Sequence, residues 1–187
     1  MDKISKKALN EKLQIPFIVV LVGVVVLIAG MFLPYMSASG EMAEYIEANP
    51  DRIEIKDLGL TASDLKDIPI ISVSKLITGI YGEDDGAIAN VFVLVFSGFL
   101  ALTALFTIFK KPIAIIIFNL FTYGTFALLN FSMKEDFIDP DKYAWGIGNH
   151  IITIAFVVVF AGSIWMFVKK IIAKKELKAQ VTTQPIE

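Results

Sequence analysis

Apolar residues fill four long stretches of this chain that contain no charged side chain, and the charged residues lie between them. The uncharged windows are Leu13–Gly40, Gly86–Phe109, Pro112–Met133 and Tyr143–Val168. Each is long enough to supply the roughly 20 residues that a helix needs to cross a bilayer. We therefore expect an all-α membrane protein, a four-transmembrane-helix bundle with spans at about 15–35, 87–109, 113–131 and 146–168.

The first window has some features of a cleaved signal peptide, since lysines precede it and the small residues Ser37, Ala38 and Ser39 follow it. Its apolar run, Ile15–Leu33, is longer than the roughly 7–15 apolar residues of a typical signal peptide. An uncleaved first span is therefore favoured, and residues 1–187 form a single integral membrane domain.

The composition supports a bilayer environment and excludes any function that depends on cysteine. Hydrophobic residues make up 56% of the chain and the mean hydropathy is +0.68, which is too apolar for a typical soluble domain. The chain has no cysteine, which excludes disulfides, thiolate catalysis and cysteine-based metal sites.

The distribution of charge predicts the orientation of the spans, because Lys and Arg accumulate in cytoplasmic loops. The N-terminal arm, the Lys110-Lys111-Pro112 link and the tail 169–187 carry eleven of the basic residues. Residues 34–85 carry eleven acids against four bases, and residues 132–145 carry four acids against two bases. We expect a multi-pass cell-membrane protein with both termini cytoplasmic, and with the loops 36–86 and 132–145 outside. Proline at 112 is well placed to begin the third span.

The long loop 36–86 should form a small, mainly helical extracytoplasmic cap. "EMAEYIEAN" reads as a short helix and "DRIEIKDL" as a brief strand. Thr61 and Asp64 have the spacing of a capping box, which predicts a helix start.

The segment "SVSKLITGIYGEDDG" closes this loop. Its apolar residues fall at i, i+3, i+4, i+7 and i+8, which predicts an amphipathic helix whose buried face consists of Val73, Leu76, Ile77, Ile80 and Tyr81. The helix is too short to span, so we expect that face to rest on the outer end of the bundle or in the headgroup layer. Gly82 and Gly86 are expected to supply the turn into span two, with the three acids between them hydrated.

Polar side chains form a stripe along span three. Asn119, Tyr123 and Asn130, together with Ala127, are spaced so that they share one helix face. The favoured interpretation is structural, with spans two and three packing through this stripe by interhelical hydrogen bonds. The alternative is a small polar cavity that holds a ligand or lines a transport path.

Asn149 and His150 lie near the outer end of span four, where they are candidate interfacial polar residues. A single histidine lacks the companions that a metal or catalytic site requires, so hydrogen bonding at the interface is favoured. A pH-sensing role stays open.

The acids of the outer loops are candidates for a partner surface, formed by Glu41, Glu44, Glu47, Glu83, Asp84 and Asp85. "GEDDG" lacks the ligand spacing of a calcium loop, so a hydrated turn is favoured over a weak divalent site. Asp136, Asp139 and Asp141 crowd one short loop, unlike the paired carboxylates of a membrane aspartyl hydrolase. We assign no catalytic residue, no metal and no cofactor, and we expect no enzyme.

Three motifs carry a resemblance to known proteins: the "FLPYMS" exit from span one, the Lys-Lys-Pro link and the Trp-Gly-Ile-Gly start of span four. Over about 71–170 the chain resembles a group of small four-span membrane proteins of low-GC Gram-positive bacteria. This implies a bacterial membrane protein but transfers no functional residue. The loop lengths are similar to those of claudins in topology alone, since the cysteine pair and Trp-rich motif of that family are missing.

Two functions remain. The leading hypothesis is a non-enzymatic membrane protein that presents its acidic outer loop to a membrane or extracytoplasmic protein, in an accessory, sensor or immunity-type role. The alternative is a small channel or carrier subunit that works as a homo-oligomer around the span-three stripe. Besides the lipid bilayer and such a partner, no nucleic acid is expected, because the basic residues flank the spans and form no folded basic surface.

Overall fold

The computed structural model of the protein describes residues 9, 11–49 and 61–182, and most of these are helical. Within these residues, three helices are long and apolar enough to cross a membrane, α6 (Glu83–Ile108), α7 (Pro112–Asp136) and α8 (Ile147–Thr182). They correspond to the second, third and fourth predicted spans. The chain is thus a multi-pass integral membrane protein, with bilayer contact along these helices.

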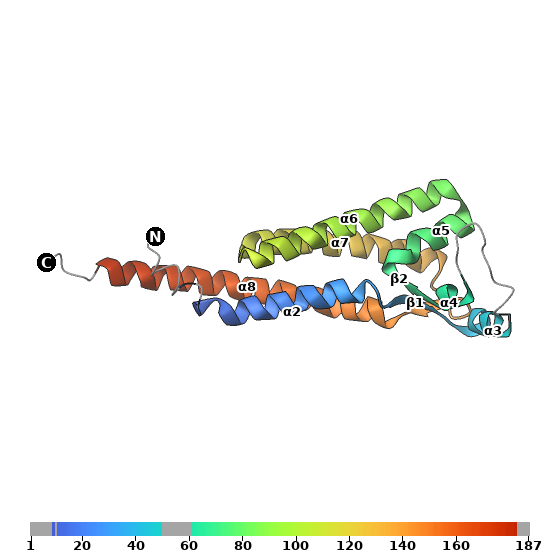
Figure 1. Cartoon of the computed structure of the whole chain (residues 1–187), viewed down its shortest axis with the longest axis horizontal. Helices are drawn as coiled ribbons and strands as arrows, with labels where there is room; N and C mark the ends of the chain where they lie inside the picture. The colour runs from blue at the N-terminus through green and yellow to red at the C-terminus, as the bar shows by residue number, and fades with distance from the viewer. Residues whose placement is uncertain (1–8, 10, 50–60, 183–187) are drawn as a thin grey trace.

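The helices pack as two pairs, α6 with α7 and α2 (Gln14–Gly30) with α8 (Figure 1). The link between α6 and α7 is as short as predicted, and Pro112 is the first residue of α7. Rings stack between this pair, with 5.3 Å between the centroids of Phe106 and Phe118. Spans two and three are therefore antiparallel neighbours, but aromatic packing joins them and the polar stripe does not.

α2 lies along α8 through small residues on its inner face. A Cβ added at Gly23 would come within 2.7 Å of Val159 Cγ2, and one at Gly30 within 2.6 Å of Ile152 Cγ1. These two glycines, one heptad apart, therefore allow the two helices to approach, as small residues do in membrane bundles. The opposite face of α2 exposes large apolar side chains, among them Ile15, Val22 and Val25.

The first predicted span, 15–35, extends too far. α2 has 17 residues and ends at Gly30, and residues 34–38 form strand β1 (Pro34–Ala38). β1 is the centre of a three-stranded antiparallel sheet, between β2 (Asp67–Pro69) and β3 (Tyr143–Trp145). Tyr35 and Met36 are completely buried in the cap, and β1 contains no charged residue. In the sequence, therefore, nothing marks where the apolar span ends and the strand begins.

The described part of the cap is mainly helical, as predicted, but its short helices surround a sheet that was not predicted. α3 (Gly40–Ala48) matches the predicted helix, whereas the strand expected at "DRIEIKDL" lies outside the described residues. α4 (Ala62–Lys66) begins with the predicted capping box, in which the Thr61 side chain accepts from Asp64 N and Asp64 accepts from Thr61 N. η2 (Ile70–Ser72) then leads into α5 (Val73–Tyr81).

α5 is the predicted amphipathic helix, and it packs on the start of α6 at the cap end of the bundle. Val73, Leu76 and Ile77 are buried as expected, but Ile80 and Tyr81 are about half exposed, at 52% and 51%. The Tyr81 ring still contacts Phe137 edge-on, with 5.9 Å between the ring centroids.

The turn after α5 is tighter than predicted, since it uses Gly82 alone, at φ 101°. Gly86 lies inside α6, and the acids before it form the first turn of that helix.

α7 and α8, the third and fourth predicted spans, both end later than predicted. α7 continues to Asp136 into the predicted loop 132–145, and β3 occupies the end of that loop. α8 continues to Thr182, so most of the predicted tail, 169–187, continues the helix of the fourth span. Figure 1 shows that α2 begins and α8 ends at the same end of the molecule, opposite the cap.

Candidate functional site

Asn130 is one point at which the cap and the bundle are hydrogen-bonded together. Its Oδ1 accepts from the Tyr35 hydroxyl at 2.6 Å and from Asn149 Nδ2 at 2.9 Å. One amide oxygen on α7 thus joins strand β1 to the first turns of α8. We call Tyr35, Asn130 and Asn149 the outer polar node.

Asn149 can reach this node because the chain before it approaches β1 closely. Gly146 N donates to Tyr35 O at 2.9 Å, and a Cβ at Gly146 would be 2.2 Å from Pro34 O. A side chain at this position would push the start of α8 off the strand. The Trp-Gly-Ile-Gly motif thus has a packing role here.

Asn119 lies deeper, between α7 and α8. Its Nδ2 donates to Phe156 O at 3.4 Å, while its Oδ1 is buried and has no partner among the described residues. Beside it lies a cavity of about 230 Å³, also lined by Tyr123, Thr153 and Phe160. An unpaired buried acceptor at a cavity is a place where a small polar molecule could bind.

The predicted stripe faces α8. Asn119 and Asn130 both hydrogen-bond to α8, and the Tyr123 ring, although it is 47% exposed, contacts Phe156 of the same helix edge-on at 5.4 Å. The prediction that the stripe packs spans two and three is wrong in its partner helix, because α8 covers it instead of α6.

His150 follows Asn149 but points elsewhere. Asn149 is 7% exposed and takes part in the outer polar node, whereas His150 is exposed. The two predicted interfacial residues therefore do not form a common site.

One side of α3 is hydrogen-bonded to the loop before β3, and its opposite side is exposed. Ser39 N donates to Lys142 O at 3.0 Å and Met42 N to Asp141 O at 3.1 Å, while Ile46 is 4% exposed. The exposed residues on the opposite side include the predicted acids and one aromatic ring, Glu41, Glu44, Tyr45 and Glu47. We call these four residues the α3 face.

A surface ion pair lies at the edge of the α3 face. Lys66 Nζ on α4 donates to Glu47 Oε1 at 2.7 Å. This hydrogen bond and the lysine charge lower the pKa of Glu47, and the carboxylate in turn raises the pKa of Lys66. Glu47 is thus partly neutralised, and Glu41 and Glu44 carry most of the negative potential of the face.

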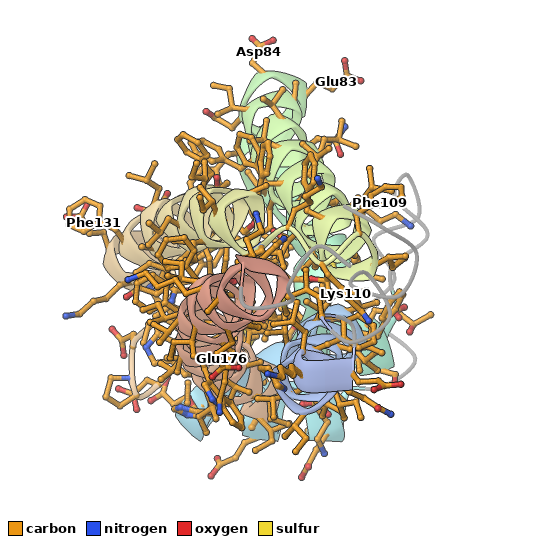
Figure 2. The ribbon with its side chains drawn as sticks, turned by 90° about the vertical axis from the view of Figure 1, so that its left-hand side faces the viewer. Glu83, Asp84, Phe109, Lys110, Phe131 and Glu176 are labelled. Atoms are coloured by element: carbon orange, nitrogen blue, oxygen red, sulfur yellow. The ribbon has the colours of Figure 1, made fainter. Side chains whose placement is uncertain are left out.

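The other predicted acids belong to a different element. Glu83, Asp84 and Asp85 form the first turn of α6, where negative charge stabilises the helix dipole. Figure 2 shows the carboxylates of Glu83 and Asp84 pointing away from the bundle. They lie at the same end of the molecule as α3 but on the side where α5 and α6 meet (Figure 1).

A cavity of about 290 Å³ lies where α5 meets α6 and α7. Asp85 and Asp136 line it, together with mostly apolar residues. Across the described ranges, no group of three His, Cys, Asp or Glu side chains is placed to hold a metal ion.

Sequence reasoning missed Tyr35 altogether. It is fully buried, and burial raises the pKa of its hydroxyl, so the group stays a hydrogen-bond donor across the physiological range. The available signal was a tyrosine directly after proline in "FLPYMS", at the point where an apolar run first meets polar residues. Tyr143 on β3 is buried as well, and its hydroxyl donates to Leu65 O at 3.1 Å.

Comparisons with known proteins give no match to this chain, either among protein-family models, among curated proteins or among solved structures. The resemblance to small four-span proteins of Gram-positive bacteria stays a prediction.

Proposed function

We propose that the protein is a non-enzymatic, four-span protein of the cell membrane that presents the α3 face to a protein partner outside the cell. The observation that carries the proposal is the construction of α3. Its back is hydrogen-bonded to the loop before β3, and its front exposes Glu41, Glu44 and Tyr45. An aromatic ring between carboxylates is suited to a partner with basic residues around an apolar pocket.

α2 is the proposed fourth span. At about 1.5 Å per residue its 17 residues measure about 25 Å, close to the roughly 30 Å hydrocarbon core. It packs along α8 and exposes an apolar outer face, which would be costly in water. With α2 as a span, the cap lies on one side of the membrane and the lysine-rich ends on the other. The positive-inside rule then favours a cytoplasmic side for the lysines.

The acids at the start of α6 are a weaker part of the surface. Their position in the first helical turn gives them a stabilising role that requires no partner. The proposal therefore rests on α3 rather than on Glu83, Asp84 and Asp85.

Photo-crosslinking in native membranes tests this function. A benzoylphenylalanine replaces Tyr45 in one variant and Tyr81 in another, since both rings are about half exposed on the cap. We expect a discrete adduct from position 45, none from position 81, and loss of the adduct when Glu41 and Glu44 are both changed to Gln. An adduct that survives those changes, or one that forms equally at position 81, would contradict docking on the α3 face.

A second function is favoured by one observation, the unpaired Asn119 Oδ1 beside its cavity. This arrangement would suit a carrier for a small polar solute. It is the weaker candidate because Asn119 and Asn130 hydrogen-bond to α8, and the cavity beside Asn119 is lined mostly by apolar residues. Flux in proteoliposomes that disappears in Asn119→Leu would favour it over partner docking.

A further inference from the structure

The end of the bundle opposite the cap carries a groove of about 480 Å³ between the start of α7 and the later part of α8. Three lysines line it, Lys111 before the first turn of α7 and Lys170 and Lys174 on α8. Its other walls are largely apolar and include Phe106, Ile117 and Phe167. Figure 2 views the molecule from this end.

The three ammonium groups lack a negative partner within the groove. No Asp or Glu is among the described residues that line it. The nearby Glu176 accepts instead from Lys12, at the start of α2. Lys170 Nζ donates to Lys110 O at 2.9 Å, which fixes this side chain at the α6–α7 link without neutralising it. Like charges held together in this way favour an anion from outside the chain.

The apolar walls determine which kind of anion fits. From Lys111 to Ile117 the groove follows α7 over about 9 Å, at about 1.5 Å per residue, and it runs into the span. α7 and α8 are both candidate membrane helices, so the groove opens toward the bilayer. A soluble anion would leave this apolar surface uncovered, whereas a lipid covers it with acyl chain and places its phosphate among the lysines.

We propose that this groove is a binding site for one anionic glycerophospholipid. The phosphate and headgroup lie between Lys111, Lys170 and Lys174, and an acyl chain lies along Ile117 and Phe167. The first backbone N–H groups of α7 add positive potential at the same position. The bound lipid relieves the repulsion between the lysines and holds α7 to α8 at the end of the molecule that the cap does not reach.

The test measures lipid retention by native mass spectrometry of the purified full-length protein, with phosphatidylglycerol and phosphatidylcholine of the same acyl chains as probes. Lys170→Gln with Lys174→Gln removes two groove charges. Lys169→Gln with Lys175→Gln is the matched control, because it removes the same charge from the same helix at residues that do not line the groove. A lysine beside the lipid phosphate contributes about 1 kcal/mol, or about fivefold in affinity, so losing two of them should weaken phosphatidylglycerol binding by about 25-fold. The control lysines do not line the groove and would not contact a single bound lipid, so we expect less than about threefold there.

Equal loss in both double variants would overturn the proposal, since it would show general attraction to the lysine-rich tail. Equal retention of the two lipids by the wild type would overturn it as well. Ile117→Trp provides a variant without a charge change, and it fills the apolar floor at an exposed position. It should weaken phosphatidylglycerol retention with unchanged circular dichroism, and undiminished retention would contradict the acyl-chain placement.

Discussion

Gly86 allows α5 to pack closely on α6, and replacing it with alanine should force the two helices apart. An added Cβ would lie 1.8 Å from Thr78 Oγ1, 2.7 Å from Thr78 Cβ and 2.9 Å from Thr78 Cα. A rotation of the Thr78 side chain could relieve the first overlap but not the contact with its backbone. The two helices would therefore have to move apart.

The cost follows from two opposing terms. Alanine favours a helix over glycine by up to about 1 kcal/mol. Overpacking costs about 1–3 kcal/mol, and any loss of burial for Val73, Leu76 or Ile77 adds up to about 1.5–3 kcal/mol for each side chain. Gly86→Ala should lower the free energy of unfolding by about 1–3 kcal/mol.

Gly98 on the same helix is the matched control, because no atom lies within 4 Å of its added Cβ. Gly98→Ala should be neutral or slightly stabilising. Thermal unfolding in detergent, followed by circular dichroism, compares the two variants. A spin label at Leu76→Cys, the sole thiol in the chain, should gain mobility in Gly86→Ala. Equal stability of the two alanine variants, with an unchanged label, would refute the close packing of α5 on α6.

Three further effects are expected in the same unfolding assay. Asn130→Leu leaves two donors of the outer polar node unpaired and should lower the free energy of unfolding by about 2 kcal/mol, and Tyr35→Phe should lower it by about 1 kcal/mol. The double variant should lose less than the sum of the two, and additive losses would contradict the shared hydrogen bond. Thr61→Ala removes the α4 cap and should cost about 1 kcal/mol, and an unchanged melting temperature would show that α4 needs no cap. Burial raises the pKa of Tyr35 above its ordinary value of 10.0, so the unfolded chain loses this proton first and stability should fall as the pH rises past about 10, less steeply in Tyr35→Phe.

The elements that the sequence predicted well have a strong local signal. Uncharged windows located α6, α7 and α8, and helical spacing located α5. The Thr61–Asp64 capping box and Pro112 marked two helix starts because their effect on the backbone is local.

The features that were missed depend on contacts between distant segments. β1 joins residues near 36 to residues near 68 and near 145, and its apolar side chains made it look like the end of a span. The partner helix of the polar stripe could not be read either, because Asn119 and Asn130 identify a face of α7 but not the helix that covers it. Ile80 continued the apolar spacing of α5 but is half exposed, because helical spacing does not show how far a neighbouring segment covers the face.

Thiol labelling tests most directly whether one end of the membrane-spanning bundle carries a folded cap that faces outward. The natural chain has no cysteine, so Glu44→Cys on α3 and Lys175→Cys on α8 each introduce a unique thiol. A membrane-impermeant maleimide applied to intact cells should label position 44, and position 175 only after permeabilisation. Labelling of position 175 in intact cells, with position 44 protected, would contradict the account.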